Sequence, residues 1–421
     1  MTNAGSVVPY GGTDAEEFAR WEGIARQVAA ELAETALERD RANRNPLAEL
    51  ELLRRNGLLG FATPREFGGA GGGLTQALRL GRIVSAADGS IGQLLTYHYS
   101  NGVWTYLLAS RAQWEHVARG VGEKGWFQGS VSNPRDPNVQ VTRAAKGLRI
   151  NGTRTFATGV AVADYITVCL FDGDRPVYVH IPPDRPGLSF GDDWDNLGQR
   201  LTASGSVTFD DVAVEPEEIL TGLDEFATAG GDPALRDGLR GLFSQLIFAT
   251  LYLGIAEGAL DAAAEYVRDR GRPWPEAPTR EATEDPYHLQ LFGRLSADVA
   301  AGVALADAVA GEYETALAAG TGLTRERWGA LAIRLDQLKS VSTEAVLDVT
   351  STIYQATGAR STANSVGLDI YWRNARTHTT HDPVAYRQRE IGDYLLNGRL
   401  PHPGRLRELA RAAARSQGNG S

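Results

Sequence analysis

"GLRINGTRTFATGV" (Gly147–Val160) departs from the helical periodicity that fills most of this 421-residue chain. Three more runs share its character: "DYITVCLFDG" (164–173), "RPVYVHIPP" (175–183) and "ASGSVTFDDVAVEP" (203–216). Each is short, rich in β-branched and aromatic residues, and bounded by Gly, Asn, Asp or Pro, which are strand and turn signals. We therefore predict a compact β-rich domain over residues 125–218, inserted between helical segments.

Helical patterns lie on both sides of this β-rich segment. Phe18, Trp21 and Ile24 begin an amphipathic stripe at spacings of three and four. The text from Leu239 onward is apolar almost all round, which is typical of a helix buried on more than one side. Four long helices with short connections indicate an antiparallel bundle. We predict a helical domain over residues 1–124, the β domain over 125–218 and a helical bundle over 219–421.

The net charge, the cysteine count and the lack of long apolar runs exclude several classes of protein. The net charge of −10 argues against a general affinity for nucleic acid or for an anionic membrane surface. The single cysteine, Cys169, cannot form an internal disulfide, and residues 1–13 lack the pattern of a signal peptide. No uninterrupted apolar run reaches the roughly 20 residues that cross a bilayer. We predict a cytoplasmic protein with neither nucleic acid nor membrane as a partner.

Near the C-terminus, "RNARTHTTHDPVAYR" (373–387) holds two of the chain's seven histidines. We expect a helix to begin at Pro383 with Asp382 as its N-cap, so that His378 and His381 lie just before it. The positive end of that helix would favour a developing anion. The pair could instead bind metal, but the HExxH frame and a third ligand beyond Asp382 are lacking, so no metal is predicted. It could also simply hydrogen-bond loop carbonyls.

Several segments together resemble the acyl-CoA dehydrogenase fold, from about residue 15 to 400. They are "GLLGFATPREFGGAGGG" (57–73), "GSVSNP" (129–134), "NGTRTFATG" (151–159) and "GQRLTASGSVTFDDVAVEPEEIL" (198–220). The block "WRNARTHTTHDPVAYRQREIGDYLLNG" (372–398) more specifically resembles one branch, the two-component flavin-dependent monooxygenases of the dibenzothiophene and dimethylsulfone type. The resemblance implies an α+β fold with an N-terminal α-helical domain, a central β-barrel-like domain and a C-terminal four-helix bundle.

The same block weakens the dehydrogenase interpretation. In much of that family, a glutamate about nine residues after an arginine takes the α-proton of the substrate. Counting from Arg373 reaches Asp382, followed by Pro383 rather than by Gly-Thr. A shorter carboxylate that caps a helix would be badly placed as this base.

The resemblance implies a flavin between the β domain and the bundle. The implied partners are Ser130, Ser132, Asn133, Phe156, Thr158 and Gly358. Ser132 and Asn133 could instead only form a turn. Gly358 remains from a Gly-Gly pair that helps to clasp FAD, whereas the matching arginine and the second glycine are lost. Reduced FMN, delivered by a separate NAD(P)H-dependent flavin reductase, is therefore the first choice of cofactor, with FAD as the other possibility.

The resemblance also places His378 and His381 at the flavin and substrate pocket, with His381 nearest the peroxide. A second polar and aromatic island, "LLTYHYSNGVW" (94–104), adds His98 as a catalytic candidate. A histidine on an apolar helix face can equally be a core residue whose hydrogen bonds are satisfied. The substrate-binding candidates on this helix are Tyr97, Asn101 and Trp104.

Taken together, the resemblance and these residues imply a reduced-flavin-dependent monooxygenase. It would insert one oxygen atom from O2 into a small apolar or aromatic substrate, at carbon, nitrogen or sulfur, through a C4a-(hydro)peroxyflavin. Secondary metabolism and xenobiotic breakdown are the expected settings, and a homotetramer or homodimer is the expected assembly. The alternatives are a divergent acyl-CoA dehydrogenase or oxidase and a catalytically silent flavin-binding or scaffold subunit.

Overall fold

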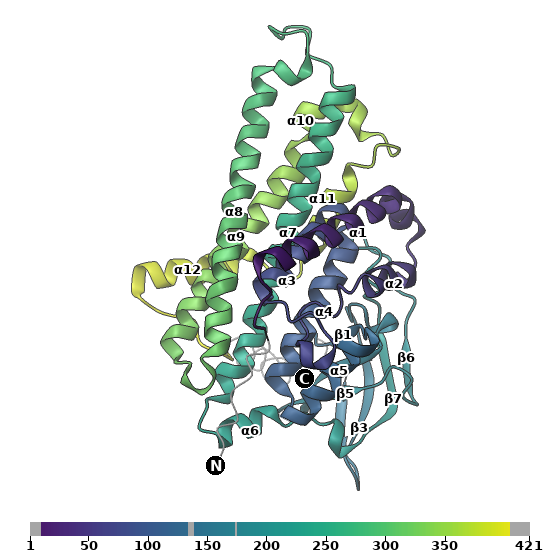
Figure 1. The fold of residues 1–421 in the computed structure, drawn as a ribbon, viewed down its shortest axis with the longest axis vertical. Helices are drawn as coiled ribbons and strands as arrows, with labels where there is room; N and C mark the ends of the chain where they lie inside the picture. The colour runs from purple at the N-terminus through teal and green to yellow at the C-terminus, as the bar shows by residue number, and fades with distance from the viewer. Residues whose placement is uncertain (1–9, 134–138, 173–174, 405–421) are drawn as a thin grey trace, which may run out of the picture.

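The N-terminal part of the molecule is a set of packed helices. The computed structural model describes residues 10–133, 139–172 and 175–404 (Figure 1). Its first helices are α1 (Ala15–Ala42), α2 (Leu47–Arg55), α3 (Leu74–Ala87), α4 (Gly89–Leu108) and α5 (Arg111–Lys124). The carboxylate of Asp14 accepts from the Glu17 N–H and caps α1, and the stripe that includes Phe18 and Leu32 is buried. The predicted amphipathic helix is confirmed.

Two small sheets follow these helices. One has the order β1-β4-β5, with β1 (Gln128–Val131) parallel to β4 (Tyr165–Asp172) and β5 (Arg175–Ile181) antiparallel to β4. The other has the order β2-β3-β7-β6, formed by β2 (Gln140–Arg143), β3 (Leu148–Arg154), β7 (Val207–Val214) and β6 (Leu188–Phe190). The predicted β-rich segment is therefore present as two sheets rather than as one closed barrel.

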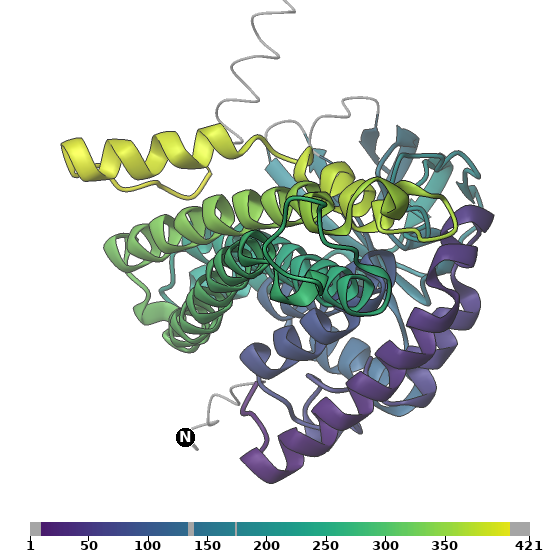
Figure 2. The same ribbon diagram turned by 90° about the horizontal axis from the view of Figure 1, so that it is seen from above.

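The C-terminal part is helical again. Its elements are α6 (Gly222–Thr228), α7 (Pro233–Arg270), α8 (Pro286–Ala318), α9 (Arg325–Thr352), α10 (Tyr354–Thr357), α11 (Asp369–Thr379) and α12 (Val384–Asn397). The long helices α7, α8 and α9 run side by side, and the shorter α12 crosses α9 (Figures 1 and 2). The predicted α+β fold class, with helical N- and C-terminal regions around small central sheets, is confirmed.

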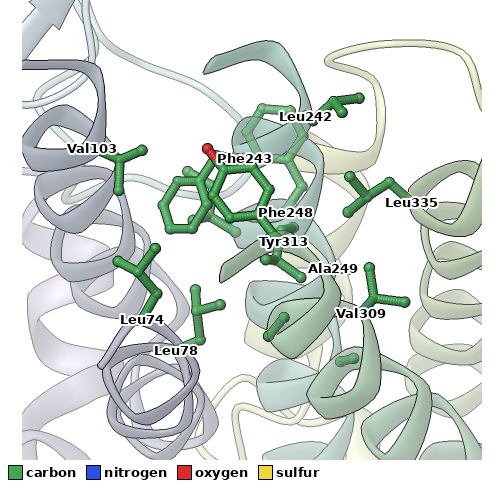
Figure 3. Packing of buried hydrophobic residues seen from close by; sticks show 14 of the residues in the cluster. Leu74, Leu78, Val103, Leu242, Phe243, Phe248, Ala249, Val309, Tyr313 and Leu335 are labelled. Carbon is green, nitrogen blue, oxygen red and sulfur yellow. The ribbon is translucent and has the colours of Figure 1, made fainter. Parts of the chain in front are cut away.

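Helix α7 forms the centre of the molecule because apolar side chains cover almost its whole circumference. Phe243 and Phe248 of α7 pack with Leu78 of α3 and Tyr313 of α8 (Figure 3). Gly258 lets α3 cross α7 closely, since a Cβ atom at this position would lie 1.9 Å from the Ala86 carbonyl oxygen. The element that carries part of the candidate site is thus fixed from several sides.

Two described helices, α7 and α8, are long and apolar enough to cross a membrane by length and composition. The most apolar window of α7 is 83% buried inside the molecule, so its apolar character serves the core. The corresponding window of α8 is only 22% buried. Burial in the core of one chain therefore does not explain the apolar side chains of α8.

Candidate active site

A cavity of about 340 Å³ lies where the helices meet the first sheet. Helix α4, strand β1 with the residue that follows it, helices α7 and α9, and the turn between α11 and α12 contribute side chains to its wall. Six of the sequence-predicted residues line this one cavity: Tyr97, Asn101, Trp104, Ser130, Ser132 and His381. The fold thus brings together side chains from both ends of the chain.

The wall of the cavity suits a flat, partly polar ligand. Phe248 and Trp104 supply apolar surface, and Ser130 and Ser132 supply hydroxyl groups at the end of β1. Within the described part of the chain, Trp104 Nε1 and Ser100 Oγ are buried without a hydrogen-bond partner. Buried polar groups are normally satisfied, so these two atoms are available to a molecule bound in the cavity. An isoalloxazine ring, with two apolar faces and one polar edge, fits this donor set.

His381 lies on the wall of the cavity in the turn after α11. Its ring centroid is 4.7 Å from that of Phe248, and its Nδ1 atom is 3.7 Å from Asp382 Oδ1. Its side chain is 56% exposed, and the ring stacks on His378 with the centroids 5.8 Å apart. His381 can therefore reach a molecule in the cavity, while its neighbours fix the ring orientation.

His378 lies behind His381 and is buried. Its Nε2 atom is 3.1 Å from the Tyr97 hydroxyl, and its Nδ1 atom is 2.9 Å from the Tyr252 hydroxyl. Burial, together with the nearby His381 and Lys339, holds the pKa of His378 well below its usual range. His378 is therefore neutral at pH 7 and contacts the cavity through Tyr97.

A buried ion-pair cluster supports this region, and the sequence analysis did not identify it. Lys339 of α9 is completely buried, and its Nζ atom lies 3.2 Å from Asp382 Oδ1. Arg387 of α12 lies 3.4 Å from the other oxygen of Asp382. Burial raises the pKa of Asp382, but the adjacent His381 ring and the charges of Lys339 and Arg387 outweigh it and hold the pKa well below its usual range. Asp382 is therefore ionised.

The predicted N-cap in this region is wrong, although the helix begins within one residue of its predicted start at Pro383. His378 belongs to the last turn of α11, and α12 begins at Val384 after Pro383, without a side-chain cap. Asp382 does not cap α12, because its carboxylate is held by Lys339 and Arg387 instead. The histidines therefore lie at the C-terminal end of one helix and in the following turn, and the expected helix N-terminus does not account for the site.

His98 lies apart from this cavity, on another side of α4. It is buried, its Nε2 atom donates to the Leu59 carbonyl oxygen at 2.8 Å, and its Nδ1 atom accepts from the Gln128 N–H at 3.2 Å. Burial lowers the pKa of His98 to about 4. With both ring nitrogens bonded to backbone groups, His98 joins α4 to the loop after α2 and to β1. His98 does not line the cavity, and its role beside the substrate stays a prediction.

The remaining predicted cofactor residues lie outside the described wall of the cavity. Phe156 has φ 58°, is 66% exposed and packs edge-on against Trp194. Thr158 accepts a hydrogen bond from Ser204, and Gly358 ends α10 with φ 70°. Asn133 directly follows Ser132. Their role in binding flavin stays a prediction.

Comparison with known proteins agrees with this arrangement. The family model "Acyl-CoA dehydrogenase, N-terminal domain" matches residues 14–123, and "Acyl-CoA dehydrogenase, C-terminal domain" matches residues 246–385. A dibenzothiophene monooxygenase from Rhodococcus qingshengii is 38% identical over 393 residues, which cover 90% of this chain and 94% of that protein. The chain belongs to the acyl-CoA dehydrogenase family.

Several of the similar proteins are named as monooxygenases. A probable FMNH2-dependent monooxygenase, SfnC, from Pseudomonas putida is 34% identical, covering 90% of this chain and 95% of its own length. The crystal structure of FMN-bound TdsC from Paenibacillus superposes with a TM-score of 0.85 at 38% identity, covering 91% of this chain and 99% of that one. The expected branch, the two-component flavin-dependent monooxygenases, is confirmed.

Proposed function

We propose that this protein is a reduced-FMN-dependent monooxygenase that acts on a small apolar or aromatic substrate. The observation that carries the proposal is that His381 and Tyr97 meet at one largely apolar cavity beside Ser130 and Ser132. Relatives named for dibenzothiophene oxidation and for FMNH2 dependence, similar over 90% of the chain, support the same chemistry. Oxygenation at carbon, nitrogen or sulfur all fall within the proposal, as do settings in secondary metabolism and xenobiotic breakdown.

Reduced FMN, when bound, supplies the two electrons with which one atom of O2 enters the substrate and the other leaves as water. The protein's own side chains would bind the flavin, orient the substrate and keep water from the reacting atoms. Ser130 and Ser132 would hold the polar edge of the flavin by hydrogen bonds, and Phe248 and Trp104 would keep bulk water from it. His381 donates a hydrogen bond toward the reacting oxygen, which stabilises negative charge as it develops there.

The cofactor and its supply follow from the relatives. SfnC is FMNH2-dependent by name, and TdsC has been crystallised with FMN, so reduced FMN is the proposed cofactor and FAD the alternative. A separate NAD(P)H-dependent flavin reductase provides the reduced flavin. We place the protein in the cytoplasm, where such a reductase has access to reduced nicotinamide.

The test supplies purified protein with FMNH2, O2 and a set of small aromatic and sulfur compounds, including dibenzothiophene and indole. We expect oxygenated product only when reduced flavin and O2 are both present, with one oxygen atom derived from 18O2 in the mass spectrum. Oxidation of an acyl-CoA thioester by an electron acceptor, with none of these products, would show a dehydrogenase instead. Equal affinity for reduced and oxidised FMN, without turnover, would show a silent subunit.

We propose a homotetramer or homodimer, supported by the apolar side chains that the single chain leaves uncovered. Leu289 of α8 is 58% exposed, and Leu395 and Leu396 of α12 are each 81% exposed. A large apolar area exposed on one chain is typical of a subunit interface.

Analytical ultracentrifugation should give the mass of two or four chains for the wild type. A Leu395→Glu, Leu396→Glu variant should shift toward the monomer, because each carboxylate would be buried unpaired at the interface. Glu34→Gln, at an exposed position of α1 and outside α8 and α12, is the control variant. A wild type that sediments as a monomer at micromolar concentration would contradict the proposed assembly.

A further inference from the structure

The buried ammonium group of Lys339, next to the histidine pair, contacts a tyrosine hydroxyl as well as Asp382. Lys339 Nζ lies 3.0 Å from the Tyr252 hydroxyl and 3.2 Å from Asp382 Oδ1. It also lies 4.9 Å from the ring centroid of Phe248 and 4.7 Å from that of Tyr252. An ammonium group persists in the interior only when it is paired, and here Asp382 pairs it. Burial lowers the pKa of Lys339, whereas the ionised Asp382 carboxylate 3.2 Å away opposes this shift and favours the ammonium form.

The charge of Lys339 determines which atoms donate along the chain of hydrogen bonds that follows. An ammonium group only donates, so the Tyr252 hydroxyl oxygen accepts from Lys339 and its single hydrogen must go elsewhere. Two acceptors are in range, both on His378: the Nδ1 atom at 2.9 Å and the backbone carbonyl oxygen at 3.2 Å. The shorter contact assigns the hydrogen of Tyr252 to Nδ1.

Once Nδ1 accepts, the neutral ring of His378 carries its hydrogen on Nε2. That N–H then donates to the Tyr97 hydroxyl oxygen, 3.1 Å away. The hydroxyl hydrogen of Tyr97 is consequently not used by His378. Since Tyr97 lines the cavity, its O–H can point toward a molecule bound there.

We propose that Lys339 is a positioning residue that fixes the tautomer of His378 through Tyr252, so that Tyr97 presents its hydroxyl hydrogen to the cavity. Hydrogen bonds run in one direction, from Lys339 to Tyr252, to His378, to Tyr97 and then to an oxygen-bearing reactant. The catalytic consequence rests on the proposed monooxygenase function, whereas the tautomer of His378 does not. Tyr97 and His381 would then donate to the reacting oxygen from two sides.

The first readout is histidine NMR of the full-length, flavin-free protein labelled with 15N-histidine, and the His378→Gln variant identifies the resonances of His378. In the wild type we expect the neutral tautomer with hydrogen on Nε2 and none on Nδ1. In Lys339→Met, Tyr252 no longer has to accept from an ammonium group, so we expect His378 to move partly or wholly to the Nδ1–H tautomer. Tyr252→Phe removes the same hydrogen-bonded link but keeps the ion pair between Lys339 and Asp382. It provides the test if Lys339→Met does not fold.

Tyr313→Phe is the matched control, because it deletes another fully buried hydroxyl, which donates to the Leu239 carbonyl oxygen at 3.1 Å. It should leave the His378 tautomer unchanged. A wild-type His378 that carries its hydrogen on Nδ1, or that is doubly protonated at pH 7, overturns the proposal. So does an unchanged tautomer in both Lys339→Met and Tyr252→Phe.

The second readout is coupling in the flavin-dependent reaction. We expect Lys339→Met and Tyr252→Phe to lower product formed per O2 consumed by about tenfold or more, with hydrogen peroxide released in its place. Tyr313→Phe should stay coupled. If no substrate is oxygenated by the wild type, the proposed function fails while the NMR result still tests the tautomer. If product forms but both variants remain coupled, the positioning role fails alone.

Discussion

Two buried histidines differ in the groups that hydrogen-bond to their ring nitrogens. His98 and His378 are both buried, and burial lowers the pKa of each. Both ring nitrogens of His98 hydrogen-bond to backbone groups, the Leu59 carbonyl and the Gln128 N–H. Both ring nitrogens of His378 hydrogen-bond to tyrosine hydroxyls, and one of these tyrosines, Tyr97, lines the cavity. Only the second arrangement connects a titratable group to the cavity.

Replacing His98 should change how stability depends on pH. Its pKa falls from 6.5 to about 4 on folding, so the unfolded chain binds a proton between these values that the folded chain does not. The stability that His98 contributes is therefore fully present above pH 6.5 and is lost as pH falls toward 4, by about 3 kcal/mol in total. We expect the free energy of unfolding of His98→Gln, measured by urea titration, to fall less steeply than that of the wild type over this range.

Tyr99→Phe is the control for this experiment, because it removes a neighbouring buried hydrogen bond, to the Leu58 carbonyl oxygen, without changing a histidine. Its difference from the wild type should be constant between pH 4 and 7. Parallel stability curves for wild type and His98→Gln would show that His98 takes up its proton equally well in the folded state.

His381 is the residue on which the chemical proposal depends most. A His381→Ala variant should stay folded, because more than half of the side chain is exposed. We expect product formation to fall by about 100-fold or more and hydrogen peroxide to rise, since the reacting oxygen loses its hydrogen-bond donor. His288→Ala, at the far end of α8 from the cavity, is the control. Normal coupling in His381→Ala would remove His381 from the mechanism.

At the scale of elements, the contact between α3 and α7 holds the wall of the cavity in place. A Cβ atom at Gly258 would lie 1.9 Å from the Ala86 carbonyl oxygen, whereas one at Gly311 of α8 would meet no described atom within 4 Å. Gly258→Ala should lower the free energy of unfolding by about 1–3 kcal/mol, because the backbones must separate. Gly311→Ala should raise it by up to about 1 kcal/mol through helix propensity. Urea unfolding of both variants measures the difference, and equal effects would contradict the close crossing.

The elements also show which features a sequence can predict. The change from helical to strand periodicity is local, so the β-rich segment could be predicted from runs such as that around Ile150. Helix α11 could not be predicted, because the Asp-Pro step directly after it suggested a loop followed by a new helix. Asp382 does not cap that new helix, because its carboxylate pairs with Lys339 in the folded protein. Lys339 carries one usable signal: it interrupts an apolar stripe of α9 whose other members, such as Leu335 and Val346, are buried.

For the whole molecule, the order of helical, β and helical segments places one cavity between parts of the chain that are far apart in sequence. Tyr97, Ser130 and His381 line the same wall, although more than 280 residues separate the first from the last. The pairing was predictable only through the resemblance to a family, since spacing alone does not say which surfaces meet. The supporting cluster of Lys339, Tyr252 and Asp382 needed coordinates, because it depends on the packing of α7, α9 and the turn after α11.

The most direct test of the central claim is the oxidation of reduced FMN in a stopped-flow spectrophotometer, with and without the protein. Anaerobic protein mixed with FMNH2 is combined with O2, and the flavin spectrum is followed. We predict a spectral phase that belongs to neither reduced nor oxidised flavin and that outlasts the oxidation of free FMNH2. This phase should shorten in His381→Ala, because the apolar cavity and its hydrogen-bond donors delay the loss of peroxide. Oxidation with the same single phase and rate as free FMNH2 would contradict the account.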